Sequence, residues 1–124
     1  MTELRVGIDI IEVDEVAESL GCFGDGYLHR VFSDAELVSA DDVSPREVAV
    51  RFAAKEAAMK AIGDFDEPLD WRSIEVISTP EGSQLHLTGR AAESARELGV
   101  RRWSISTSVT ERYALAIALA AVEA

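Results

Sequence analysis

Residues 51–60 gather three basic side chains and one acid into a short stretch of the chain. Arg51 and Lys55 lie one helical turn apart. Glu56 and Lys60 have the same spacing, so each pair shares one face if the stretch is helical. The spacing alone favours a solvated helix face with an ordinary ion pair. The alternative is an anion-binding site beside a carboxylate that can hold Mg²⁺, because Mg²⁺ binds one or two protein carboxylates together with substrate phosphates.

Asp9 is a second candidate for chemistry. It interrupts an apolar segment in which Val6, Ile8 and Ile10 alternate on one side, so its carboxylate points to the opposite side. Burying a carboxylate is costly unless it is paired or bound to a metal. The sequence leaves two interpretations open: the strand is solvated on the side of Asp9, or Asp9 has such a partner.

Periodicity and capping signals predict the elements that position these residues. The alternation in residues 5–11 predicts a strand that carries Asp9. Ser44 and Pro45 are typical of the start of a helix and Gly63 of its end, so a helix is predicted over 45–62. Elsewhere the pattern predicts a helix from Val13 to a stop at Gly21, a loop over 21–26, a short helix opened by Ser33–Glu36, a loop over 64–70, strands over 73–78 and 84–87, a helix over 90–98, and strands over 103–109 and 113–119.

This order of elements predicts one domain over residues 1–124. Its class is α+β, with an antiparallel sheet packed against a long central helix. The last predicted strand has an alanine at every second position: Ala114, Ala116, Ala118 and Ala120. Such a face packs closely either against a helix that lies on the sheet or against another subunit, and the alternation alone favours the helix.

The balance of charge limits the partners of the chain. It has 12 Lys and Arg against 23 Asp and Glu, a net charge of −11, which predicts no binding to nucleic acid or anionic membranes. The sequence has no apolar run near the roughly 20 residues of a membrane helix. Its single cysteine, Cys22, suits a reducing compartment, so a cytoplasmic location is predicted. Any anionic ligand must be held by a local cluster of bases.

Two segments resemble the signature motifs of the holo-acyl-carrier-protein synthases, which are small-type 4′-phosphopantetheinyl transferases. The first is VGIDIIEV at 6–13, and the second is RFAAKEAAMKAIG at 51–63. Three further segments are similar to the same family in the same order: RVFSDAEL at 30–37, WRSIEV at 71–76 and LTGRAA at 87–92. The resemblance therefore covers nearly the whole chain, and paired motifs at this spacing are specific.

The resemblance implies the 4′-phosphopantetheinyl transferase fold and a reaction. Coenzyme A donates its phosphopantetheine to a serine of an acyl carrier protein and releases 3′,5′-ADP. Asp9 and Glu56 are implied to hold Mg²⁺ on the pyrophosphate, and Lys60 to contact phosphate and offset developing charge. This fits phosphoryl transfer, which depends mostly on positioning and charge neutralisation. The coenzyme A site is implied to include, besides Lys60, three more residues of the second motif: Arg51, Lys55 and Gly63.

The family also implies how the serine is activated and how the chain assembles. A carboxylate or a metal-bound water accepts the serine proton. Family members usually form trimers with active sites at subunit boundaries, so a homotrimer is expected, and the alanine face over 114–120 offers it one possible contact.

The chain departs from the family pattern at three places. Thr107 stands where the family usually has a histidine near the coenzyme A phosphates, and Gly82–Gln84 lacks the proline of the family's turn. The first helix of the family presents basic residues to an acidic carrier. Here the corresponding stretch carries only acids: Glu12, Asp14, Glu15 and Glu18.

These departures keep a second hypothesis open. Like charges disfavour association, so weak use of an ordinary acidic carrier is expected, and Glu15 stands where the family most often has arginine. The chain would then be a protein of the same fold with a changed task. That task is coenzyme A or carrier binding without transfer, other small-molecule chemistry, or a role as an assembly partner.

Overall fold

The computed structural model describes residues 2–39, 44–63 and 70–123. The chain begins with strand β1 (Thr2–Glu12), reaches the long helix α4 (Pro45–Ile62) after three shorter helices, and ends with strands β4 (Val100–Val109) and β5 (Tyr113–Glu123). The other elements are α1 (Val13–Phe23), α2 (Asp25–Val31), α3 (Asp34–Ser39), η1 (Trp71–Ser73), β2 (Ile74–Thr79), β3 (Gly82–Leu87) and α5 (Gly89–Leu98). The predicted loop over 64–70 lies outside the described residues except for its last position.

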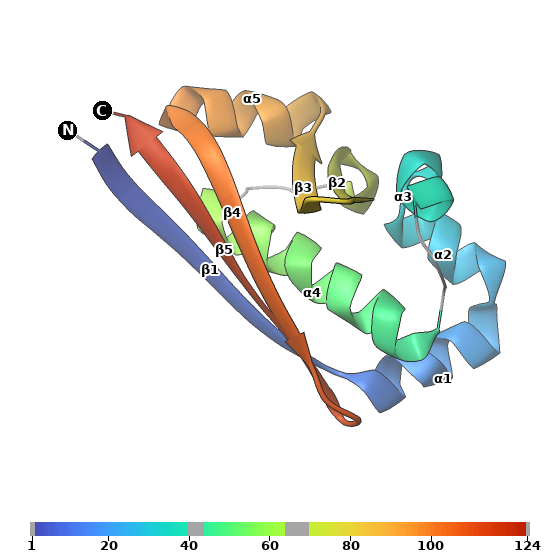
Figure 1. Cartoon of the computed structure of the whole chain (residues 1–124). Helices are drawn as coiled ribbons and strands as arrows, with labels where there is room; N and C mark the ends of the chain where they lie inside the picture. Colours follow the sequence, from blue (N-terminus) through green and yellow to red (C-terminus); the bar gives the residue numbers. More distant parts are fainter. Residues whose placement is uncertain (1, 40–43, 64–69, 124) are drawn as a thin grey trace.

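The strands form two antiparallel sheets. One has three strands in the order β1-β5-β4, and the other is the β2-β3 hairpin. Figure 1 shows α4 running along the three-stranded sheet, with α5 near its C-terminal end, α1–α3 gathered near its N-terminal end, and the hairpin between α5 and α3. The predicted α+β class, with an antiparallel sheet packed against a long central helix, is confirmed.

The alanine face of β5 packs against α4. Ala114, Ala116, Ala118 and Ala120 have no exposed surface, and alanines of α4 lie in the same core cluster. Small side chains on both elements let helix and sheet approach closely. Gly7 on β1 extends this contact, because a Cβ built there would lie 1.8 Å from the Ala57 carbonyl oxygen. The prediction of a helix on this face is therefore confirmed, and the alternative of a subunit contact through the alanines is wrong.

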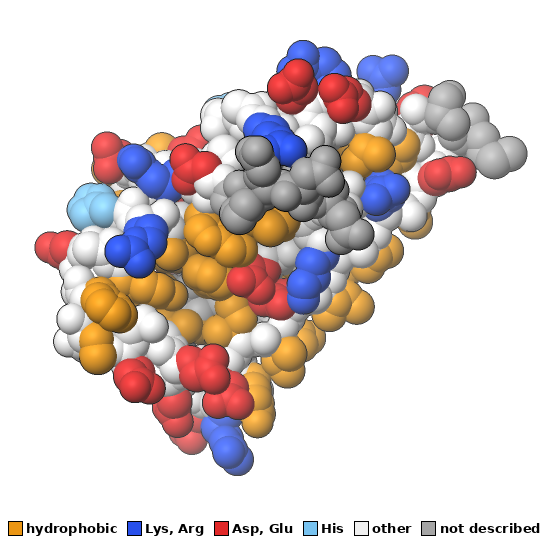
Figure 2. All heavy atoms as spheres, turned by 180° about the vertical axis from the view of Figure 1, so that it is seen from behind, with side chains coloured by type: hydrophobic (Ala, Val, Ile, Leu, Met, Phe, Trp, Pro, Cys, Tyr) orange, Lys and Arg blue, Asp and Glu red, His pale blue; other side chains and the backbone are white. Residues whose placement is uncertain are grey.

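The opposite face of the same sheet is apolar and exposed. Four β1 side chains on this face are each more than half exposed: Leu4, Val6, Ile8 and Ile10. Their partners in the register with β5, Ala121, Leu119, Ile117 and Leu115, are only partly buried. In Figure 2 a row of hydrophobic side chains follows the edge of the molecule where β1 lies. Contiguous apolar patches of this kind mark interaction surfaces.

Capping signals set the helix ends that were predicted from them. The Ser44 hydroxyl accepts a hydrogen bond from the Glu47 amide at 3.3 Å, and α4 begins with Pro45. At α3 the capping box is reciprocal. The Glu36 amide donates to the Ser33 hydroxyl at 3.2 Å, and the Ser33 amide donates to the Glu36 carboxylate at 3.0 Å.

The predicted loop over 21–26 is wrong. Helix α1 continues through Gly21 to Phe23, and α2 begins at Asp25. The break falls at Gly24, whose φ of 52° lies in the left-handed region and whose amide donates to the Leu20 carbonyl oxygen. A glycine inside an exposed helix costs only about 1 kcal/mol, so the glycine in the left-handed conformation ends the helix and the earlier one does not.

Candidate active site

Asp9 and Lys60 join β1 to the last turn of α4. The Lys60 ammonium donates to Asp9 Oδ1 at 2.8 Å and to the Ile8 carbonyl oxygen at 3.1 Å. The Asp9 side chain is 8% exposed, whereas the Lys60 side chain is 56% exposed. The second carboxylate oxygen, Asp9 Oδ2, is buried and has no hydrogen-bond partner among the described residues. The interpretation of a strand solvated on this side is therefore wrong: Asp9 is buried and paired.

Glu56 brings a second carboxylate to the same place. The pKa of Glu56 is raised to about 7: burial is the main cause, the adjacent Asp9 carboxylate adds to it, and Lys60 opposes it. Two carboxylates this close cannot both ionise without a cation between or beside them. The hydrogen bond to Asp9 also raises the pKa of Lys60, which keeps the ammonium charged.

The donor set fits a hard divalent cation. It consists of two adjacent carboxylates, and one buried oxygen of Asp9 has no hydrogen-bond partner among the described residues. Carboxylate oxygens are ligands that Mg²⁺ prefers. Within the described ranges no group of three or more His, Cys, Asp or Glu side chains could hold a metal. A cation held by this pair would therefore take its remaining ligands from water or from the phosphates of a substrate.

Arg5 and Gly7 fix how close β1 lies to α4. The Arg5 guanidinium donates from Nε to the Ala61 carbonyl oxygen at 2.7 Å and from Nη2 to the Ile62 carbonyl oxygen at 3.2 Å. These carbonyls have no partners within the helix, and a cation at a helix C-terminus also interacts favourably with the helix dipole. No local pattern signals this role of Arg5, although the alternation places it on the same side of the strand as Asp9.

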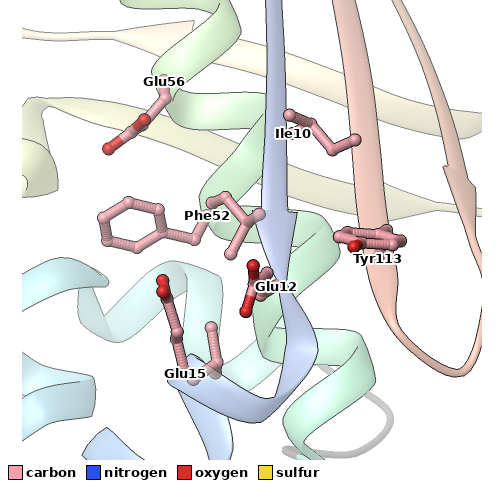
Figure 3. Close-up of a pocket in the computed structure, with 8 residues that line it drawn as sticks. Ile10, Glu12, Glu15, Phe52, Glu56 and Tyr113 are labelled. Atoms are coloured by element: carbon pink, nitrogen blue, oxygen red, sulfur yellow. The ribbon is translucent and has the colours of Figure 1, made fainter.

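A pocket of about 460 Å³ opens beside Glu56. Figure 3 shows Glu56 at one end of it, Glu12 and Glu15 at the other, and the Phe52 ring between them. The remaining lining residues are Ile10, Ile11, Val16 and Tyr113. Sequence reasoning predicted the acids but not the pocket, because it forms only where β1, α1, α4 and β5 meet.

Lys55 lies elsewhere, at the centre of a buried polar cluster. Its ammonium has no exposed surface, donates to Glu36 Oε1 and lies 5.0 Å from the centroid of the Phe32 ring. The other Glu36 oxygen accepts the Val76 amide of β2 at 3.0 Å. Burial lowers the pKa of Lys55, and the charge of Glu36 opposes that shift. The structure therefore does not bring Lys55 to the Asp9–Glu56 pair.

Arg51 is also buried, on the same side of α4. Its guanidinium donates to Ser78 Oγ at 2.7 Å, to the Glu36 carbonyl oxygen at 3.2 Å and to Glu47 Oε1 at 3.3 Å. The prediction of a solvated helix face is thus wrong for both bases. Arg51 nevertheless lines a second cavity, of about 270 Å³, whose walls include Ser83 and Thr107. A contact of Arg51 or Lys55 with phosphate stays a prediction.

Gly63 was predicted to belong to the site, whereas Tyr27 was not. Gly63 ends α4 with a φ of 119°, and a Cβ there would lie 3.1 Å from Arg5 Nη2. Its role in cofactor binding stays a prediction. Tyr27 of α2 was not identified from the sequence: burial raises the pKa of its phenol, and the charge of Glu56 raises it further. The phenol therefore lies near Glu56, and no local pattern signals this contact.

Comparison with known proteins gives the family. The model of the 4′-phosphopantetheinyl transferase superfamily matches residues 5–118. A holo-[acyl-carrier-protein] synthase from Koribacter versatilis is 43% identical over 117 residues, covering 91% of this chain and 94% of the relative. A holo-[acyl-carrier-protein] synthase from Herpetosiphon aurantiacus is 38% identical over 121 residues, covering 91% of this chain and 94% of the relative.

Solved structures are similar over almost the same extent. The acyl carrier protein synthase of Chronobacterium ammoniagenes in complex with coenzyme A has a TM-score of 0.82 and 28% identity, covering 98% of this chain and 99% of that one. The Helicobacter pylori holo-[acyl-carrier-protein] synthase in complex with coenzyme A has a TM-score of 0.78 and 26% identity, covering 93% and 98%.

The chain therefore belongs to the 4′-phosphopantetheinyl transferase superfamily, as an enzyme of the holo-acyl-carrier-protein synthase type. The family and the fold predicted from the paired motifs are both confirmed. No helix among the described residues is long and apolar enough to cross a membrane.

Proposed function

We propose that this chain uses Mg²⁺ to transfer 4′-phosphopantetheine from coenzyme A to a serine of an acyl carrier protein, with release of 3′,5′-ADP. The observation that carries the proposal is the arrangement of Asp9, Glu56 and Lys60. It combines two adjacent carboxylates, an orphaned buried oxygen and a half-exposed ammonium at one end of α4. The relatives named as holo-acyl-carrier-protein synthases support the same reaction.

Each residue has a separate task in this reaction. Asp9 and Glu56 hold the cation, which when bound would neutralise charge on the pyrophosphate. Lys60 contacts the phosphate oxygens and balances the charge that develops as the bond to 3′,5′-ADP breaks. The serine oxygen forms the new bond to the phosphorus that carries pantetheine as the bond to 3′,5′-ADP breaks, and the serine proton passes to a carboxylate.

The proposal includes a homotrimer. The exposed apolar face of β1, described above, gives it a contact surface that the buried alanine face cannot offer. Sedimentation at micromolar concentration should give a mass three times that of the 13.5-kDa chain. A 13.5-kDa species alone would contradict the trimer, and Ile8→Glu should dissociate it while Glu18→Lys, at an exposed position of α1, should not.

The transfer itself is tested by mass. The protein is incubated with coenzyme A, Mg²⁺ and a panel of apo acyl carrier proteins, and the carrier is weighed by mass spectrometry. A carrier that gains one phosphopantetheine only when Mg²⁺ is present supports the proposal. Coenzyme A binding without any transfer to the panel would instead favour the second candidate, a same-fold protein with a changed task, which Thr107 and the acidic α1 suggest. A cytoplasmic location stays part of the proposal.

A further inference from the structure

Arg5, Gly7 and Asp9 form a row on the side of β1 that faces α4. They are alternate residues of the strand, so they point to the same side. Figure 1 shows β1 and α4 side by side, with the start of the strand near the end of the helix. Arg5 bonds to the backbone at the end of α4, and Asp9 pairs with Lys60. The row therefore has a polar contact with the helix at each end and a glycine between them.

The surfaces between these two polar contacts are shallow. Gly7 lets the strand approach the helix so closely that a Cβ there would lie 1.8 Å from the Ala57 carbonyl oxygen. Over residues 114–120 the neighbouring strand β5 presents only buried alanines to the helix. Side chains this small interlock little, so they fix the separation of strand and helix more than the position of one along the other. The polar contacts at Arg5 and Asp9 fix that position.

Arg5 binds the last turn of α4. Its Nε donates to the Ala61 carbonyl oxygen at 2.7 Å, and its Nη2 donates to the Ile62 carbonyl oxygen at 3.2 Å. The last carbonyls of a helix have no partners within it, so these hydrogen bonds satisfy them and oppose fraying of the turn. Gly63 leaves room for the guanidinium, because a Cβ there would lie 3.1 Å from Arg5 Nη2.

Lys60 depends on that turn for its position. Its side chain is 56% exposed, so burial does not hold it in place. It reaches Asp9 Oδ1 and the Ile8 carbonyl oxygen from the turn that Arg5 binds. Fraying of the turn would therefore release Lys60, and with it the contact between α4 and Asp9.

The carboxylate pair depends on the same arrangement. Asp9 belongs to β1 and Glu56 to α4, so a shift of the strand along the helix changes the distance between the two carboxylates. Asp9 Oδ2 is buried without a hydrogen-bond partner among the described residues, so no hydrogen bond to the protein holds that oxygen. A displacement of about 1 Å can cost about a hundredfold in rate, and residues that orient metal ligands change metal affinity or activity by about 10–100-fold.

We propose that Arg5 is a positioning residue for the site formed by Asp9, Glu56 and Lys60. Its guanidinium joins β1 to the last turn of α4, which keeps both carboxylates and the ammonium in the arrangement that binds the cation. Its two hydrogen bonds go to helix carbonyls, so Arg5 acts through the backbone and not through the substrate. The inference rests on the proposed function and adds a residue that neither signature motif contains.

The test compares Arg5→Met and Arg5→Lys with the parent in phosphopantetheine transfer. Arg5→Met removes both hydrogen bonds, so kcat should fall about 10–100-fold while KM for coenzyme A changes less than about twofold. Arg5→Lys keeps the charge and a donor at the helix end and should recover most of kcat. A rise in KM with an unchanged kcat would show that Arg5 contacts the substrate, and would overturn the inference.

Two control variants separate positioning from charge and from stability. Arg96→Met removes the same charge from the last turn of another helix, α5, where Arg96 is exposed. Ile74→Val removes one methylene from a fully buried side chain of β2, which should lower the thermal unfolding midpoint by a few degrees, as Arg5→Met should. Both controls should keep the parent's kcat. A loss in either control as large as that in Arg5→Met would overturn the inference.

Metal affinity keeps this test separate from the proposed function. Mg²⁺ alone is titrated into the protein by calorimetry, without coenzyme A or a carrier. Arg5→Met should bind Mg²⁺ about tenfold more weakly than the parent, whereas Arg5→Lys and Arg96→Met should bind it about as tightly. That result supports the inference even if no carrier is modified, an outcome that would contradict only the proposed transfer. Equal Mg²⁺ affinities and equal kcat for the parent and Arg5→Met would overturn the inference and leave the transfer intact.

Discussion

Helix α4 carries two lysine–carboxylate pairs that differ in completeness. Lys55 and Glu36 have no exposed surface, and both Glu36 oxygens have donors. Lys60 is half exposed, and its partner Asp9 keeps one buried oxygen without a hydrogen bond among the described residues. The Lys55–Glu36 pair is called the closed pair here, because both of its carboxylate oxygens have donors. The Lys60–Asp9 pair is called the open pair, because it has an unfilled acceptor beside another carboxylate, Glu56.

Under the proposed function, the difference separates a structural pair from a catalytic one. A complete buried pair ties elements together, here α3 and β2 to α4 through Glu36. In an incomplete pair, the buried acceptor has lost its hydration and gained no hydrogen bond, which costs free energy. A ligand that binds to this acceptor can offset that cost. Lys55 and Lys60 lie on the same predicted helix, each one turn from another charged residue, so the sequence does not distinguish them. Their burial in the fold does.

The largest expected effect is on stability, at the closed pair. Lys55→Met leaves the buried Glu36 carboxylate without its cation, which should lower the free energy of unfolding by about 3–5 kcal/mol. Lys60→Met should cost only about 1 kcal/mol, since water can reach the exposed end of that pair. Urea unfolding of the two variants measures both values. Similar losses would contradict the distinction between the pairs.

Gly7 tests whether the open pair depends on the spacing of β1 and α4. Gly7→Ala places a methyl group 1.8 Å from the Ala57 carbonyl oxygen, so strand and helix must separate, at a cost of about 1–3 kcal/mol. Asp9 moves with the strand and Glu56 with the helix, so Mg²⁺-dependent transfer should fall even at a temperature where the variant is fully folded. Thermal unfolding and the transfer rate are measured on the same preparation.

Gly21→Ala is the matched control for that variant. No atom lies within 4 Å of a Cβ at Gly21, which is exposed inside α1. The added methyl should stabilise the protein by up to about 1 kcal/mol and leave the transfer rate unchanged. A loss of transfer in Gly21→Ala as large as that in Gly7→Ala would show that the close approach of β1 to α4 is not what matters.

Local signals predicted most of the fold. The capping residues at Ser33 and Ser44 act within one turn of the chain, so the starts of α3 and α4 could be read from sequence alone. The alternation of apolar residues likewise predicted strands β1 and β5, because it is also a pattern of neighbouring residues. The loop over 21–26 failed because two glycines compete there, and the choice between Gly21 and Gly24 depends on backbone conformation.

The site was predictable only where a family motif contained it. Asp9, Glu56 and Lys60 do come together, as the paired motifs implied. The destination of Lys55 was not predictable, because its partner Glu36 comes from another helix and is held in turn by β2. Arg5 acts through the end of a helix more than fifty residues away, a contact that exists only after β1 and α4 pack.

The smallest expected effect is the pH dependence of the open pair. The raised pKa of Glu56 means that its proton stabilises the metal-free fold, an effect complete below its ordinary pKa of 4.5 and lost as the pH rises through about 7. The same proton competes with Mg²⁺. Mg²⁺ affinity should therefore be about tenfold higher at pH 8 than at pH 6. Calorimetric titration at the two pH values measures it, and Glu56→Gln should remove the difference.

The most direct test of the account is Mg²⁺-dependent transfer by Asp9→Asn and Glu56→Gln, which keep the size of each side chain but remove its charge. Each variant should lose at least about a hundredfold in transfer rate. Glu56→Gln should also keep the thermal unfolding midpoint of the parent or exceed it, because its repulsion with Asp9 has been relieved. Asp9→Asn should stay folded with a somewhat lower midpoint, because it loses the ion pair with Lys60. Phosphopantetheine transfer at the parent's rate by either folded variant would contradict the assignment of the open pair as the catalytic centre.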